Sequence, residues 1–126
     1  MTEEIFRITK DEKRAKALKD MAKNRFENMS LFKEPYRILE EYYEIIKELL
    51  TSFMYMRGFK TLSHKSLMEF SKKNIQSLSG REMDLIDELR IKRNNIVYYG
   101  ERITKDFLIN REKSIKEIIN KLFDLM

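Results

Sequence analysis

The chain has 126 residues, of which 42% are hydrophobic and 37% are charged. This size and composition are typical of one domain with a single core, here residues 1–126. There is no cysteine and only one histidine, His64. Disulfides, thiolate metal sites, cysteine nucleophiles and multi-histidine metal sites within one chain are therefore excluded, and we expect no metal or cofactor.

The formal net charge is +5, which permits an anionic partner such as nucleic acid without requiring one. A bilayer-spanning helix needs roughly 18 to 20 apolar residues, and even the richest run, residues 38–56, carries five charged side chains. The amino terminus lacks the pattern of a secretory signal. We expect a cytoplasmic protein with no membrane partner.

Three glycines and one proline are few for a fold rich in sheets and turns, so we expect an almost wholly helical chain. The first helix is expected over about residues 3–29, which are heavily charged but carry one apolar stripe. The second is expected from Pro35 to about Arg57, with Gly58 just beyond its end. Two parallel apolar stripes place this second helix at the centre of a bundle: Ile38, Tyr42, Ile45, Leu49 and Phe53 beside Leu39, Tyr43, Ile46, Leu50 and Met54.

Three further helices are expected in the second half of the chain. A short one follows Ser63, with Leu67, Met68 and Phe70 on its buried side. The next begins with the capping pair Ser79 and Glu82 and ends before Gly100. The last is capped by Thr104 and shows an apolar stripe of Leu108, Ile115, Ile119, Leu122 and Met126. We predict an all-α fold, an up-and-down bundle of four long helices plus one short helix.

The fourth helix contains a local irregularity. Its predicted buried stripe is Leu85, Leu89 and Ile96, and Arg93 occupies the position that completes it. Arg90 likewise occupies an apolar position on the neighbouring stripe, four residues after Ile86 and seven before Val97. A guanidinium cannot be neutralised on burial, so both arginines need a carboxylate, a cleft, an interface or a bound anion. The alternative is that their stems cover apolar surface while their heads reach water.

The excess positive charge is concentrated in two windows. Residues 57–73 carry a net charge of +4, and residues 90–102 carry +3. If the windows meet in space they form one basic patch, and the candidate phosphate contacts are Arg90, Lys92, Arg102 and His64. The alternative is that the lysines simply solvate exposed faces.

The segment ELRIKRNNIVYYG at residues 88–100 resembles the signature of the HEPN superfamily, an Arg often followed by Asn and then, after four to six residues, a His. Residues 33–70 resemble the central helix and following turn of an archaeal-type branch, so the resemblance covers about half the chain. It implies a helical bundle that dimerises with the motifs facing each other. Many members are metal-independent ribonucleases, including toxins encoded beside a minimal nucleotidyltransferase antitoxin.

Carried over by position, the motif arginine is Arg93, the polar residue after it is Asn94, and Tyr98 stands in place of the histidine. A tyrosine, with an ordinary pKa of about 10, is a poor general base at neutral pH, although it can donate a hydrogen bond or stack on a base. His64 is the one residue that could replace the missing base, and a capping or packing role is its alternative. The resemblance supports the fold better than the activity.

Two classes of function remain open. One is a catalytically weakened HEPN-like protein that binds RNA or a nucleotide in a toxin and antitoxin system; any enzymatic activity would be that of a metal-independent endoribonuclease. The other is a non-catalytic homodimeric module that partners a minimal nucleotidyltransferase or another protein. We expect a homodimer in either case, formed through the fourth helix and the aromatic face of the second.

Overall fold

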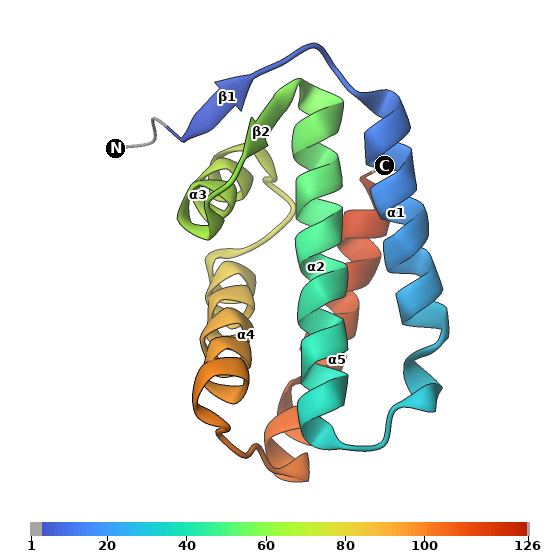
Figure 1. The fold of residues 1–126 in the computed structure, drawn as a ribbon, viewed down its shortest axis with the longest axis vertical. Helices are drawn as coiled ribbons and strands as arrows, with labels where there is room; N and C mark the ends of the chain where they lie inside the picture. Colours follow the sequence, from blue (N-terminus) through green and yellow to red (C-terminus); the bar gives the residue numbers. More distant parts are fainter. Residues whose placement is uncertain (1–3, 126) are drawn as a thin grey trace.

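The computed structural model describes residues 4–125. The elements in chain order are β1 (Ile5–Arg7), α1 (Glu12–Glu27), the 3-10 turn η1 (Met29–Leu31), α2 (Pro35–Arg57), β2 (Phe59–Thr61), α3 (His64–Asn74), α4 (Gly80–Tyr99) and α5 (Lys105–Asp124). The chain runs down α1, up α2, down α4 and up α5, with the short α3 inserted before α4 (Figure 1). The expected mostly helical class, with four long helices and a short one, is confirmed.

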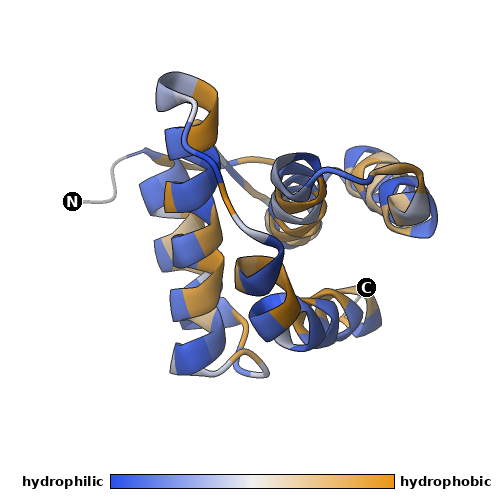
Figure 2. Ribbon diagram, turned by 90° about the horizontal axis from the view of Figure 1, so that it is seen from below, coloured by the Kyte–Doolittle hydropathy of each residue, from blue (hydrophilic) through white to orange (hydrophobic). Residues whose placement is uncertain are grey.

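The bundle is less regular than expected, because α4 is tilted. Seen from below, α4 is nearly side-on while α1 and α2 are nearly end-on (Figure 2). Both α4 and α5 pack against α2, but they make little contact with each other. An open groove therefore separates α4 from α5 along one side of the molecule.

The prediction of one helix over residues 3–29 is wrong at its start, because α1 begins only at Glu12. Ile5–Arg7 instead form a strand that pairs antiparallel with Phe59–Thr61. The apolar stripe of α1 begins at Ala15, so the residues before Asp11 gain no buried helical face. The Asp11 carboxylate accepts a hydrogen bond from the backbone N–H of Arg14 at 3.0 Å, which starts the helix here.

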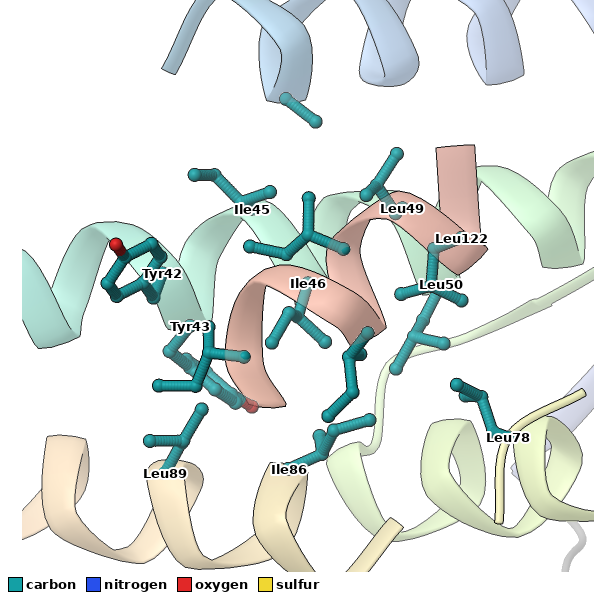
Figure 3. Packing of buried hydrophobic residues seen from close by; sticks show 14 of the residues in the cluster. Tyr42, Tyr43, Ile45, Ile46, Leu49, Leu50, Leu78, Ile86, Leu89 and Leu122 are labelled. Carbon is teal, nitrogen blue, oxygen red and sulfur yellow. The ribbon is translucent and has the colours of Figure 1, made fainter. Parts of the chain in front are cut away.

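Helix α2 begins and ends where the sequence predicts, and it packs against α1, α3, α4, α5 and β2. Gly58 terminates it in the left-handed conformation, with φ of 84°, and a Cβ there would lie 3.0 Å from the carbonyl oxygen of Ile8. Both predicted stripes are buried except for Ile38, which is partly buried. Figure 3 shows the core that they form with α4 and α5.

The burial of α2 corrects one expectation about its aromatic face. Tyr42, Tyr43 and Phe53 are each at most 3% exposed. They belong to the core of this chain, so they are not available to a second copy. The α2 aromatic that remains exposed is Tyr36, at 44%, and it lines the same cavity as Ile96 of α4.

Helix α4 starts with the predicted capping box, in which Ser79 and Glu82 bond each other's backbone N–H groups, and it ends at Gly100 with φ of 65°. Its buried face differs from the expected stripe. The buried residues are Met83, Ile86 and Leu89, whereas Leu85 and Ile96 are only partly buried. No α4 residue after Leu89 is buried, so the motif segment lies at the edge of the core.

The remaining helices follow the sequence closely. Ser63 caps α3, where Leu67 and Phe70 are buried and Met68 is partly buried. Thr104 caps α5, and its predicted stripe is buried from Leu108 to Leu122; Met126 lies outside the described residues. Within residues 4–125, no helix is both long and apolar enough to span a membrane.

Candidate anion-binding site on α4

Arg93 extends from α4 across the face of Tyr43 on α2. Its guanidinium carbon lies 5.6 Å from the centre of the tyrosine ring, a cation–π contact. The guanidinium donates one hydrogen bond, to Oδ1 of Asn94 at 3.2 Å. It forms no ion pair with any carboxylate of residues 4–125. Most of its N–H donors therefore have no protein acceptor in the described chain.

Tyr43 connects Arg93 to the start of α3. Its side chain points from α2 toward α4, beside Leu89 (Figure 3). A hydrogen bond of 2.9 Å joins the Tyr43 hydroxyl to Nδ1 of His64. Burial raises the pKa of Tyr43 to about 12, although Arg93 and Arg90 favour its ionised form. The hydroxyl is therefore neutral at physiological pH, and its hydrogen bond holds the imidazole in place through Nδ1.

The electrostatic environment of His64 is positive. Partial burial against Tyr43 lowers the pKa of His64, and the charges of Lys47, Arg93 and Arg90 lower it further, while Glu44 acts in the opposite direction. The ring still lies at the surface. A cationic field next to solvent favours an anion, and it disfavours a second positive charge on His64 itself.

Arg90 and Lys92 each have an acidic partner, but the two partners lie in different elements. Arg90 donates from Nε to Oδ1 of Asp87, one turn earlier on α4, at 2.9 Å. Lys92 donates to Oε2 of Glu101 at 2.9 Å and lies over the ring of Phe107. The hydrogen bond from Lys92 lowers the pKa of Glu101. Lys92 thus links α4 to the loop before α5, while one-third of its side chain (33%) stays exposed.

Asn94 and Tyr98 separate in space. Asn94 is bonded to Arg93, as described above, but Tyr98 is 70% exposed. Five residues along a helix correspond to a rotation of roughly 140°, so Arg93 and Tyr98 point in different directions. No hydrogen bond or ring contact joins them within the described chain. A single copy of the protein does not bring these two motif positions together.

The two basic windows meet only in part. His64 from the first window and Arg93 from the second contact the same Tyr43 ring. Lys72 and Lys73 lie in the exposed last turn of α3, roughly 12 Å along the helix from His64. Their positive charges are stabilised there by the helix dipole. Arg102 is exposed and lines a separate cavity of about 420 Å³ beside Tyr36 and Ile103. The site is therefore smaller than the predicted basic patch.

Sequence analysis does not identify Tyr43 as a member of this site, because it places Tyr43 in an apolar stripe of the second helix, nor does it identify Lys47 as a charge that acts on His64. A usable signal existed: a tyrosine in a buried stripe needs a partner for its hydroxyl, and the chain offers one histidine. No cluster of three or more His, Asp or Glu side chains within residues 4–125 could hold a metal ion.

Comparisons of this chain with protein-family models, with curated proteins and with solved structures find no match. The functional argument therefore depends on the geometry of the site.

Proposed function

We propose that this protein is a HEPN-like RNA-binding protein with weakened catalysis, and that Arg93 is its central phosphate contact. The observation that carries the proposal is the guanidinium of Arg93, which is supported on Tyr43 and lacks a carboxylate partner among residues 4–125. An arginine held in this way presents its N–H donors to a planar, multi-oxygen acceptor such as phosphate.

Neighbouring groups extend the contact surface. Arg90 keeps further N–H donors beyond its bond to Asp87, and it adds positive potential at His64. Tyr98 and Tyr99, 70% and 83% exposed, lie at the end of the same helix on a different side from Arg93, where they offer stacking surfaces for bases farther along an RNA strand. Stacking platforms beside phosphate contacts are typical of proteins that bind single-stranded RNA.

Cleavage is expected to be weak because no proton acceptor touches Arg93. No hydrogen bond joins His64 to Arg93 in the described chain, and the Tyr43 hydroxyl is hydrogen-bonded to Nδ1 of the imidazole. A ribonuclease of the HEPN type would need a base beside the phosphate. The proposal is thus RNA binding first, with metal-independent endoribonuclease activity as a residual or partner-dependent property.

A second candidate is a homodimeric interaction module that partners a nucleotidyltransferase or another protein. The observation that favours it is the number of apolar side chains exposed on α4, namely Ile91, Val97, Tyr98 and Tyr99, with exposures from 46% to 83%. Exposed apolar surface of this kind is often an interface. Under this candidate, Arg93 would pair with a carboxylate of the partner.

A salt titration of RNA binding separates the two candidates. Fluorescence anisotropy of a labelled single-stranded RNA should give an affinity that falls steeply with salt, because phosphate contacts release counterions. Arg93→Ala should weaken binding for all sequences alike and reduce the salt slope by about 1. The matched control is Arg81→Ala, an exposed arginine roughly 18 Å away along the same helix.

Equal affinities for Arg93→Ala and Arg81→Ala would contradict the role of Arg93. Absence of any salt-sensitive RNA binding in a protein that sediments as a dimer would favour the interaction module.

A further inference from the structure

A small cavity of about 220 Å³ lies between the second half of α2, β2 and the start of α3. Its lining contains two lysines, the histidine and four hydroxyl groups, with a few apolar side chains behind them. These lining residues are Lys47, Thr51, Met54, Tyr55, Lys60, Thr61, Leu62, Ser63, His64 and Leu67. No acidic residue of the described chain contributes to the lining.

We propose that this cavity binds a single phosphate group, and we call it the phosphate cavity. Cavities that enclose a whole small-molecule ligand usually have volumes of about 300 to 1,000 Å³, so this one is too small for a complete nucleotide. A phosphate group fits such a space, with the rest of the molecule outside. The site is distinct from Arg93, which does not line it.

Of the four hydroxyl groups of the cavity, that of Thr51 already donates to the backbone carbonyl of Lys47 at 2.8 Å, and the other three accept hydrogen bonds. The Thr61 hydroxyl oxygen accepts from the backbone N–H of Ser63 at 3.1 Å, and the Ser63 hydroxyl oxygen accepts from that of Ser66 at 3.2 Å. The Tyr55 hydroxyl oxygen accepts from Arg14 at 3.1 Å. Because the oxygens of Tyr55, Thr61 and Ser63 already accept a bond, these three O–H protons remain to be donated. Three hydroxyl donors in one lining match the oxygens of a phosphate.

The charged groups point to the same ligand. Lys60 is exposed and forms no hydrogen bond or ion pair within residues 4–125. Lys47 pairs with Glu44 at 3.0 Å, one turn earlier on α2, and Glu44 does not line the cavity. His64 is bonded through Nδ1 to Tyr43, which leaves Nε2 without a partner in the described chain. A phosphate would therefore meet one unpaired ammonium, one shared ammonium and one imidazole.

Two larger grooves of the described chain have linings of the opposite net charge. The groove between α4 and α5 is lined by Glu82, Asp84, Glu88 and Glu117 against Arg81 and Arg111. The groove between α1 and α2 is lined by Asp20 and Glu41 against Arg25. Charge therefore favours an anion in the phosphate cavity over these two grooves.

The single histidine makes the proposal directly testable. In the NMR spectrum, the imidazole signals can only come from His64. Inorganic phosphate should shift them saturably, whereas chloride at equal ionic strength should not. In the free protein, Lys47, Arg90 and Arg93 lower the pKa of His64, and only the carboxylate of Glu44 acts in the opposite direction. Bound phosphate should also raise the pKa of His64, because its negative charge offsets the three positive charges.

Variants separate the phosphate cavity from the Arg93 site. Lys60→Ala should weaken phosphate binding several-fold, while Lys33→Ala, an exposed lysine before α2, should leave it unchanged. Arg93→Ala should retain the saturable response. A response lost in Arg93→Ala but kept in Lys60→Ala would overturn the proposal, as would an imidazole that phosphate does not shift.

Further ligands identify the source of the phosphate. A 5′-phosphorylated RNA should bind more tightly than its 5′-hydroxyl counterpart if the cavity takes an RNA end, and this preference should disappear in Lys60→Ala. Equal binding of inorganic phosphate and a nucleoside monophosphate, with no preference between the two RNAs, would mean that the ligand is a free phosphate compound. Because inorganic phosphate needs no RNA site, this test stands even if the RNA-binding proposal fails.

Discussion

The guanidinium of Arg93 lies 5.6 Å from the centre of the Tyr43 ring and forms no ion pair with a carboxylate of residues 4–125. The arginine that interrupts an apolar stripe is thus accommodated by an aromatic face at the edge of the core. Stacking of this kind supports the side chain without neutralising it, which keeps its charge available for a ligand.

Removing Arg93 should therefore have little effect on stability. A partly exposed cation–π contact contributes about 0.5 to 1 kcal/mol, so Arg93→Ala should change the free energy of unfolding by no more than that. Arg93→Leu, which completes the apolar stripe, should be neutral or stabilising. Thermal unfolding followed by circular dichroism gives the comparison. A melting temperature lowered by more than about ten degrees in Arg93→Ala would identify a structural role instead.

Arg25 should behave in the opposite way. It donates to Glu48 at 3.1 Å and to Glu41 at 3.1 Å, and Glu48 is only 7% exposed. Arg25→Ala leaves a buried carboxylate without its cation and should cost about 2 to 3 kcal/mol, below the full penalty for a wholly buried pair because Arg25 is one-third exposed. Urea denaturation measures the loss. The double variant Arg25→Ala/Glu48→Gln should recover part of it, and no recovery would show that Glu48 is not the group left unpaired.

The same carboxylate gives a pH dependence with a defined sign. Burial raises the pKa of Glu48 above its ordinary value, although Arg25 opposes the shift. The native state therefore binds this proton more tightly than the unfolded state, and stability from this group is lost as pH rises through the native pKa. Glu48→Gln mimics the protonated form, so its stability relative to the native chain should be greater at pH 7 than near pH 4. A difference that is equal at both values, or larger in acid, would contradict this.

The boundaries of the helices could be predicted from sequence because their signals are local. Pro35 and Gly58 delimit α2, and Ser79 with Glu82 starts α4, each within one turn of the helix end. The strand Ile5–Arg7 could not be predicted, since its partner Phe59–Thr61 is distant in sequence and only the fold brings them together. Intrinsic preference over three residues is too weak to show such a pair.

In the candidate site, too, features that depend on one helix were predictable, and contacts between separate elements were not. Arg93 was found because it breaks a stripe on its own helix. Its support by Tyr43, and the bond from Tyr43 to His64, depend on how α3 folds back after Gly58 and on the tilt of α4. Lys92 was predicted as a phosphate contact, but Glu101 in the following loop already pairs with it. Contacts between separate elements decide which basic residues remain free.

The expected homodimer now has a narrower interface, the outer face of α4. Val97, Tyr98 and Tyr99 are more than half exposed there, and the aromatic residues in the core of α2 are excluded. Sedimentation at micromolar protein should give twice the chain mass of 15.4 kDa. Val97→Glu should shift the protein toward monomer, whereas Ile109→Glu, 67% exposed on α5, should not. A monomeric native chain would rule out this interface.

The last prediction is that the native chain cleaves RNA weakly or not at all on its own. Proton transfer by a positioned base commonly contributes about 10² to 10⁴ in rate, and a phenol at the Tyr98 position accepts a proton poorly at neutral pH. Tyr98→His restores the residue that the resemblance expects. In a dimer whose motifs face each other, as the resemblance implies, it should raise cleavage of a labelled RNA in the presence of a chelator. Arg93→Ala should abolish that gain, because Arg93 supplies the charge that stabilises the phosphate.

His64→Ala completes the comparison, since His64 is the one histidine near Arg93 and shares the Tyr43 ring with it. If the native chain is weak, His64→Ala should leave its background unchanged and should not reduce the activity gained by Tyr98→His. If the native chain already cleaves and both Arg93→Ala and His64→Ala abolish the activity, weakened catalysis is the wrong description. His64 would then act as the base, with its free Nε2 reaching a substrate that Arg93 holds.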